Sequence, residues 1–266
     1  MSEAVVAVTA IAPVMREASV RAEQVTQLVL GETASALEQQ GEWIRVRIDF
    51  DHYEGWVNEG YVRQLDAAAA NAWRGAASGW SEGARVTVGA DVVRVPLRAR
   101  VQLEGGGLVM LPDDRAGRSI DAELRPVAEV AAAARRMTPE RWALERFRGA
   151  PYQWGGITPW GVDCSGLVQT TFAARGTRLP RDAAQQIGCG SEVALDAVRP
   201  GDLLFFRSEQ GHDRITHVAF VAEGDALIHS TIACGGVVQE PFSAGSRADR
   251  TLRPRLAAAR RLEVRP

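Results

Sequence analysis

The sequence predicts an α+β protein in which small β modules precede a mixed helix-and-sheet domain. Short segments rich in β-branched and aromatic residues, separated by Gly and Asp, fill residues 1–66 and return in residues 81–130. Helical patterns appear from residue 138 onward, and further strand-like segments follow them. The length of 266 residues suits two domains, or one domain with small modules.

Residues 1–66 are predicted to form a small β-barrel. Five short strands are expected there, at Val5–Ala10, Val25–Leu30, Thr33–Glu38, Trp43–Ile48 and Glu54–Asn58. Glycines and Asp51 punctuate these segments as turn residues do. So many strands in so short a stretch are typical of a barrel.

Residues 67–80 are rich in Ala, Gly and Ser and are predicted to be a linker, although the Ala run also suits a short helix. Residues 81–130 are again strand-like and rich in turns. The expected strands are Arg85–Val88, Val92–Val95, Val101–Leu103 and Leu108–Leu111. The three glycines at 105–107 predict a hairpin turn between the last two strands.

Residues 131–266 are predicted to form an α+β domain. Thr138 suits an N-cap and Pro139 the first turn of a helix that Gly149 can end. Two more helices are expected at about 164–175 and 182–187. Strands are expected at 203–207, 215–222, 226–231 and 236–240. Helices that come first and an antiparallel sheet after them are typical of α+β architecture.

The composition excludes several classes of protein. Hydrophobic residues at 46% and charged residues at 24% argue against a disordered or fibrous chain. No apolar run approaches the ~18–20 residues of a membrane span. The balance of 31 basic and 33 acidic residues argues against nucleic-acid binding. Met1–Val14 lacks a basic segment, which is untypical of a secretory signal, so a cytoplasmic location is expected and secretion is the alternative.

Three cysteines, Cys164, Cys189 and Cys234, are too few and odd in number for a disulfide framework. The chain has no CxxC or HExxH arrangement, so neither a metal site nor a cofactor is expected. A cysteine followed by histidines, here His217 and His229, is the pattern of nucleophilic catalysis.

Cys164 is expected at the first turn of its helix, where the helix dipole and free backbone N–H groups favour the thiolate and could bind an oxyanion. His217 and His229 lie in consecutive expected strands, which a hairpin would bring together. One imidazole would then pair with the thiol and the other would orient it. Each residue also has a plainer interpretation, a small buried cysteine or a hydrogen-bonded core histidine.

Six segments occur in the order PYQWGG, GVDCSGLVQ, LPRDAAQQ, RPGDLLFF, ITHVAFV and LIHS. Together they resemble the NlpC family of papain-like cysteine peptidases over residues 138–241. The resemblance implies a papain-like NlpC domain with Cys164 as nucleophile and His217 as general base. It further implies that His229 is the third polar residue and that Tyr152 helps to form the oxyanion site.

The segments AEQVTQLVLGE, GEWIRVR and YEGWV resemble a bacterial SH3-like domain over residues 12–65. Residues 81–128 are interpreted as a second, divergent copy. This order, with the segment LPRDA, is similar to the γ-D-glutamyl-L-diamino acid endopeptidases of dipeptidyl-peptidase VI type. In that subgroup the SH3-like module closes one end of the cleft, so the peptide substrate must carry a free N-terminal L-Ala.

The resemblance also implies substrate-binding residues in the NlpC-type domain. Asp182 matches the acidic residue that binds the substrate amine, and Ser165 is similar to a residue that contacts the substrate. Arg181 is a candidate for the D-Glu α-carboxylate by its charge alone. A structural or solvated role for Arg181 is an equal alternative.

Two residues of the SH3-like module, Glu23 and Tyr53, match the positions expected to complete the amine-binding pocket. Tyr61 is the alternative to Tyr53, because loop lengths vary in this module. A closed pocket of this kind excludes N-acylated peptides by steric clash.

The function expected from the sequence is hydrolysis of the γ-D-Glu–diaminoacid bond of small murein peptides during cell-wall peptide recycling. The diamino acid, diaminopimelate or lysine, stays open, and so does the oligomeric state. The alternatives are a secreted peptidoglycan hydrolase anchored by its SH3-like domains, a non-catalytic murein-peptide-binding protein, and an acyltransferase on the same scaffold.

Overall fold

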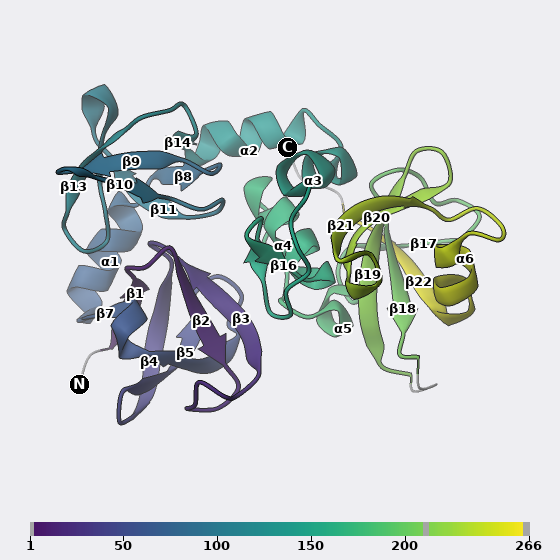
Figure 1. Cartoon of the computed structure of the whole chain (residues 1–266), viewed down its shortest axis with the longest axis horizontal. Coiled ribbons are helices and arrows are strands. Elements are labelled where there is room, and N and C mark those ends of the chain that lie inside the picture. The colour runs from purple at the N-terminus through teal and green to yellow at the C-terminus, as the bar shows by residue number, and fades with distance from the viewer. Residues whose placement is uncertain (1–2, 210–212, 263–266) are drawn as a thin grey trace. The chain divides into compact units, whose positions relative to one another are not determined.

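The structure is a computed structural model that describes residues 3–209 and 213–262 (Figure 1). The chain divides into two compact units, Met1–Val130 and Ala131–Pro266. The first unit is built mainly from strands, and the second combines helices with an antiparallel sheet. The predicted α+β fold class is therefore confirmed.

The first unit begins with a sheet in which the described residues form seven strands, in the order β3-β2-β6-β5-β4-β1-β7. The strands are β1 Ala4–Ala7, β2 Ile11–Met15, β3 Gln24–Val29, β4 Thr33–Gln40, β5 Trp43–Ile48, β6 Glu54–Asn58 and β7 Val62–Leu65. Alternate side chains of β5 are buried, as a strand with one solvated face requires. The bounds of β5 and β6 are those predicted.

Two strands of this module, β2 and β7, were not predicted. Pro13 lies inside β2, and proline is normally a signal against a strand. In β7 two polar residues, Arg63 and Gln64, are exposed, so the segment carries little apolar pattern. Both strands form through pairing with partners elsewhere in the module, and β7 pairs with β1 across more than fifty residues of chain.

Residues 67–80, predicted as a linker, contain helix α1 (Ala67–Ala76) and the start of the next sheet. The Asp66 carboxylate caps this helix by accepting a hydrogen bond from the Ala69 N–H at 2.7 Å. The indole N–H of Trp73 in α1 donates to the carbonyl of Gly31 at 2.8 Å. The connection is therefore an ordered helix packed on the first module.

Residues 79–126 form a second sheet of seven strands within the described part of the chain. They are β8 Gly79–Ser81, β9 Arg85–Val88, β10 Asp91–Arg94, β11 Arg100–Leu103, β12 Leu108–Met110, β13 Ala116–Ser119 and β14 Leu124–Pro126. The hairpin predicted at residues 105–107 is confirmed, because a short 3-10 turn there joins β11 to β12.

The second sheet repeats the strand order of the first. Its order, β10-β9-β13-β12-β11-β8-β14, is that of the first sheet with seven added to each strand number. Gly55 in β6 and Gly117 in β13 occupy equivalent strands. A Cβ at Gly55 would lie 2.6 Å from a Val14 side-chain carbon, and one at Gly117 would lie 2.4 Å from a Val86 side-chain carbon. Both modules therefore need glycine where these strands cross closely.

The two modules of the first unit are joined by main-chain and charged contacts. The Arg100 N–H donates to the Leu30 carbonyl at 2.8 Å. The guanidinium of Arg98 lies 2.6 Å from the Glu32 carboxylate, with side chains only 2% and 9% exposed. Since breaking a buried ion pair leaves an uncompensated charge, these contacts hold the two modules in one arrangement.

The second unit packs helices beside an antiparallel sheet (Figure 1). Its helices are α2 Val127–Arg135 at the boundary with the first unit, α3 Pro139–Phe147, α4 Cys164–Ala174, α5 Ala183–Gln186 and α6 Arg247–Leu252. The main sheet has the order β17-β22-β18-β19-β20-β21 in the described residues. Its strands are β17 Ser191–Val193, β18 Leu203–Arg207, β19 Ile215–Ala222, β20 Ala226–Thr231, β21 Gly236–Pro241 and β22 Leu256–Arg261. A two-stranded sheet, β15 Ile157–Thr158 and β16 Gly161–Val162, precedes α4.

The predicted bounds of β18, β19 and β20 are confirmed, whereas β22 was missed. Residues 256–261 read LAAARR, which lacks the β-branched residues of a typical strand. The strand nevertheless pairs with both β17 and β18. Thr138 stands at the predicted N-cap of α3, but its hydroxyl donates to the Glu140 carboxylate and makes no capping bond to the backbone.

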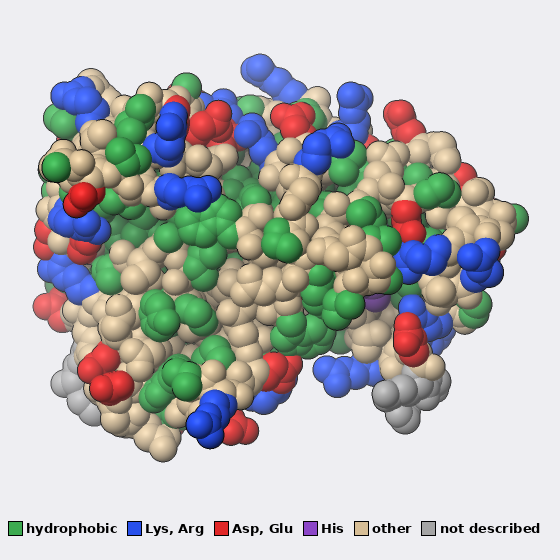
Figure 2. All heavy atoms as spheres, viewed as in Figure 1, with side chains coloured by type: hydrophobic (Ala, Val, Ile, Leu, Met, Phe, Trp, Pro, Cys, Tyr) green, Lys and Arg blue, Asp and Glu red, His purple; other side chains and the backbone are tan. Residues whose placement is uncertain are grey.

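Positive and negative side chains are interspersed over the face shown in Figure 2, in keeping with the net charge of −2. Within the described ranges, no helix combines the length and apolar character that a membrane crossing requires.

Candidate active site

Helix α4 carries Cys164 at its first position, as predicted, and every residue of this helix is buried. Asp163 is the N-cap, and its Oδ1 accepts a hydrogen bond from the Gly166 N–H at 2.7 Å. The helix packs against β19 and β20, the strands that carry the two histidines. The local sequence thus places the thiol at a helix start, and the packing directs that start toward the sheet.

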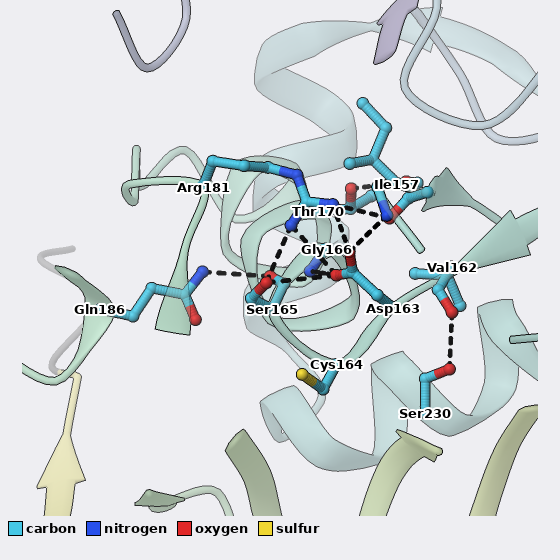
Figure 3. Close-up of polar contacts among 12 residues, drawn as sticks. Ile157, Val162, Asp163, Cys164, Ser165, Gly166, Thr170, Arg181, Gln186 and Ser230 are labelled. Carbon is cyan, nitrogen blue, oxygen red and sulfur yellow. Dashed lines mark hydrogen bonds and ion pairs between the residues drawn. The ribbon is translucent and has the colours of Figure 1, made fainter. Parts of the chain in front are cut away.

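A buried ion pair between Arg181 and Asp163 lies at the start of α4, next to Cys164 in the chain (Figure 3). Arg181 lies 3.0 Å from Oδ1 and 2.5 Å from Oδ2 of Asp163 and also donates to the Ser165 hydroxyl at 2.8 Å. The Gln186 amide donates to the carbonyl of Ser165 at 3.0 Å. In Figure 3 the Cys164 side chain points away from this cluster. The cluster therefore positions the start of α4, and the Cys164 thiol is not one of its members.

The electrostatics of Cys164 differ from the sequence-based expectation. Burial raises the pKa of the thiol to about 12, and the charge of Asp163 adds to the rise. Backbone N–H groups of Val218 and Ser165 and the charge of Arg181 act in the opposite direction. The expected stabilisation of the thiolate by the helix terminus is present but smaller than the cost of desolvation. The thiol is therefore protonated near neutral pH.

His217 and His229 meet across the β19–β20 hairpin, as predicted. The register pairs Phe220 with Ile228 and Ala222 with Ala226, which places both histidines on one face of the sheet. Nε2 of His217 lies 2.7 Å from Nδ1 of His229. The Cys164 sulfur lies 4.0 Å from the Thr216 carbonyl oxygen, so the thiol sits against the segment of β19 that carries His217.

Two residues that the sequence did not single out, Glu240 and Arg247, extend this chain of contacts. Nε2 of His229 lies 2.7 Å from a carboxylate oxygen of Glu240, and the Nε of Arg247 donates to the other oxygen at 3.1 Å. His229 pairs with Val238 in the β20–β21 ladder, so Glu240 follows two residues later on the same face. Knowledge of the register of this hairpin would have predicted that Glu240 lies beside His229.

The charge states of this chain follow from burial and pairing. Burial lowers the pKa of His217 well below its ordinary value, and the charges of His229, Arg255 and Arg247 lower it further. Burial opposes ionisation of Glu240, yet hydrogen bonds from His229 and Arg247 lower the pKa of its carboxyl. Because ionised Glu240 can only accept, Nε2 of His229 carries the proton and Nδ1 of His229 accepts from His217.

Tyr152 lies near the thiol at the start of the segment that leads into β15. Its N–H donates to the Gly235 carbonyl at 2.9 Å. Burial raises the pKa of the phenol above its ordinary value, and the nearby charges of Cys164 and Asp163 raise it further. The hydroxyl therefore stays protonated and can donate a hydrogen bond at neutral pH.

The three substrate-binding candidates of the second unit have different surroundings. Ser165 is 6% exposed and bonded to Arg181. Arg181 is only 1% exposed, and both carboxylate oxygens of Asp163 engage it, which favours the structural role over contact with a substrate carboxylate. Asp182 is half-buried at the start of α5, and its charge contributes to the raised pKa of Arg181.

The candidates of the first unit lie in its first module. Glu23 forms a surface ion pair with Arg16 at 2.6 Å. Tyr53 is half-buried against the core of the module, and Tyr61 is 39% exposed. Their contribution to a closed pocket stays a prediction.

A cavity of about 480 Å³ adjoins the two histidines. Tyr152 lines it on one side, and Arg247 and Arg255 line it from the C-terminal segment. Among the described residues, no three or more His, Cys, Asp or Glu side chains form a group that could hold a metal ion.

The segment that carries Cys164, His217 and His229 matches a known family model. Residues 149–255 match the NlpC/P60 family model. They form an NlpC/P60 domain. Residues 14–60 match the model of the bacterial dipeptidyl-peptidase Sh3 domain. The resemblances stated from the sequence are therefore confirmed for both domains.

The curated relatives match about a third of this chain, and each match covers only part of the relative's own length. The γ-D-glutamyl-L-lysine dipeptidyl-peptidase of Bacillus subtilis is 46% identical over 84 residues, which is 32% of this chain and 28% of that protein. The probable endopeptidase NlpC of Escherichia coli is 38% identical over 93 residues, which is 35% of this chain and 60% of that protein. The matched segment thus spans less than two thirds of each relative.

A crystal structure of an NlpC/P60 family protein from Bacillus cereus shares the fold of the whole chain. Its TM-score is 0.77 at 18% sequence identity, and the match covers 97% of this chain and 99% of that one. At this identity the similarity shows the fold alone.

Proposed function

We propose that the protein is a cysteine endopeptidase that hydrolyses the γ-D-Glu–diaminoacid bond of murein peptides with a free N-terminal L-Ala. The observation that carries the proposal is the hydrogen-bonded chain of His217, His229 and Glu240, in which both histidines lie on strands that pack against the Cys164 helix. The name of the Bacillus subtilis relative, a γ-D-glutamyl-L-lysine dipeptidyl-peptidase, supports the bond that is proposed.

The acylation step follows from the protonation states. Neutral His217 takes the proton from the Cys164 thiol as sulfur attacks the γ-carbonyl carbon of D-Glu, and the C–S bond forms. The oxyanion accepts hydrogen bonds from the Tyr152 hydroxyl and from backbone N–H groups at the start of α4. His217 then gives its proton to the leaving amine as the C–N bond breaks.

The deacylation step uses water. His217 takes a proton from water as the water oxygen attacks the thioester carbon. The C–S bond breaks, the proton returns to sulfur, and L-Ala-D-Glu leaves with a free carboxylate. The chain of His229 and Glu240 supports the imidazolium that forms in each half of the reaction.

Asp182, half-buried at the start of α5, is the residue proposed to bind the free amine of the N-terminal L-Ala. A requirement for a free amine would restrict the enzyme to peptides already released from the polymer. That restriction is the basis for proposing a role in cytoplasmic recycling of wall peptides, as against cleavage of intact peptidoglycan.

Paired digestion tests the proposal. L-Ala-γ-D-Glu-diaminopimelate and its N-acetylated form are each incubated with the protein and with Cys164→Ala. Cleavage of only the free peptide, absent in Cys164→Ala, is the expected result. Equal cleavage of both peptides would favour the wall-hydrolase alternative. Binding of the free peptide without cleavage would favour a peptide-binding protein.

A further inference from the structure

The cavity beside the two histidines is lined by an ion pair in which a ligand can replace the acidic partner. Glu209 and Arg255 both line it, and NH1 of Arg255 lies 3.3 Å from the Glu209 carboxylate. The Glu209 side chain is 81% exposed, whereas that of Arg255 is 19% exposed. An ion pair with so exposed a partner contributes little stability, so a ligand can displace Glu209 at small cost.

Arg255 is held in place independently of Glu209. Its Nε donates to the Thr251 carbonyl at 2.8 Å, and this bond does not use NH1, the atom that meets Glu209 at the cavity. Arg247, the other arginine of the cavity, is already engaged by both oxygens of Glu240. Arg255 is therefore the cation better placed to bind an anionic ligand group.

The chemistry of the proposed reaction places the leaving residue beside this cavity. His217 must come within hydrogen-bond distance of the leaving amine in order to protonate it. The same ring lines the cavity. The side chain of the leaving residue therefore lies next to the cavity.

We propose that this cavity binds the side-chain end of the leaving diamino acid, and that Arg255 and Glu209 select diaminopimelate over lysine. The inference rests on the proposed function for the orientation of the substrate. A diaminopimelate side chain ends in a carboxylate and an ammonium on one carbon. A lysine side chain ends in an ammonium alone.

Charge balance gives the physical reason for the selection. When diaminopimelate enters, its carboxylate replaces that of Glu209 as the partner of Arg255. Its ammonium then forms an ion pair with the Glu209 carboxylate. Each charge of the opened pair then has a new partner. Lysine supplies a partner for Glu209 but none for Arg255. The guanidinium fork matches a carboxylate in a bidentate geometry, which adds to the discrimination.

Binding to the inactive Cys164→Ala protein, measured by calorimetry, tests this inference. The two ligands are L-Ala-γ-D-Glu-diaminopimelate and L-Ala-γ-D-Glu-lysine, which share every group except the side-chain carboxylate. Diaminopimelate peptide is expected to bind roughly 10-fold more tightly. Arg255→Leu in the same background is expected to abolish this preference by weakening the diaminopimelate peptide. Arg250→Leu is the matched control, because Arg250 lies on α6, is exposed and does not line the cavity.

Each outcome separates the inference from the proposed function. Equal affinity for the two peptides overturns the inference, and so does an equal loss for both in Arg255→Leu. Cleavage of both peptides at the same rate by the active protein supports the peptidase proposal and contradicts the selection of diaminopimelate over lysine. A diaminopimelate preference in binding without any cleavage supports the selection and contradicts the peptidase proposal. Absence of binding to either peptide contradicts both.

Discussion

Nε2 of His217 lies 2.7 Å from Nδ1 of His229, and this contact assigns the tautomers of both rings. Glu240 accepts from Nε2 of His229, so Nδ1 of His229 must accept from Nε2–H of His217. Nδ1 of His217 then bears the lone pair. The carboxylate of Glu240, two rings away, thus leaves Nδ1 of His217 able to accept a proton, as the role proposed for His217 as a base toward Cys164 requires.

Glu240→Gln is expected to lower kcat by roughly 10-fold to 100-fold, because an amide can present its NH₂ to His229 and reverse both tautomers. KM should change little, since Glu240 has no proposed contact with substrate. Steady-state kinetics of Glu240→Gln beside Glu240→Asp, which keeps the carboxylate, would check this. An unchanged kcat in Glu240→Gln would show that the carboxylate does not set the tautomers.

The acid limb of the kcat/KM profile is expected below pH ~6.5, the ordinary pKa of histidine. Because burial and neighbouring charges lower the pKa of His217, its imidazole stays neutral and able to accept a proton as the pH falls to that lowered value. A pH profile of kcat/KM between pH 4 and 9 measures this limb. A limb at pH 7 or above would contradict the lowered pKa.

Cys164 is expected to react slowly with iodoacetamide at pH 7.5 in the absence of substrate, because the raised pKa, about 12, keeps the thiol protonated. The exposed Cys234 should be modified first. Peptide mass spectrometry over time, with Cys164→Ala to assign the modified peptide, would give both rates. Fast modification of Cys164 at this pH would instead indicate a preformed thiolate–imidazolium pair.

Arg181→Leu is expected to destabilise the protein by about 3–5 kcal/mol, because it leaves the Asp163 carboxylate buried without its cation. The double variant Asp163→Asn, Arg181→Leu should recover part of that loss, since asparagine keeps the cap of α4 and removes the charge. Urea unfolding of both variants measures the effect, with the exposed Arg250→Leu as control. A double variant no more stable than Arg181→Leu would argue against the uncompensated charge as the cause.

The sequence was sufficient where a local pattern determines local structure. Segments 43–48 and 215–222, which are rich in β-branched and aromatic residues, predicted β5 and β19 closely. The N-cap Asp163 before an apolar run predicted α4. Strand β22 could not be predicted, because its Ala and Arg residues carry no strand pattern and its pairing with β17 and β18 supplies its stability. Glu240 was missed because only the register of β20 with β21 brings it to His229.

By itself the sequence determined the order of the modules and the cysteine–histidine pattern, since both depend on the kinds of residue and their spacing. The tertiary structure decided the charge states. Desolvation by the surrounding chain raises the pKa of Cys164 against the effect of its own helix terminus. It also decided the role of Arg181, whose guanidinium meets Asp163 in the interior and is thereby unavailable to the surface. Both outcomes depend on burial and on distances between residues far apart in the chain, which no local pattern contains.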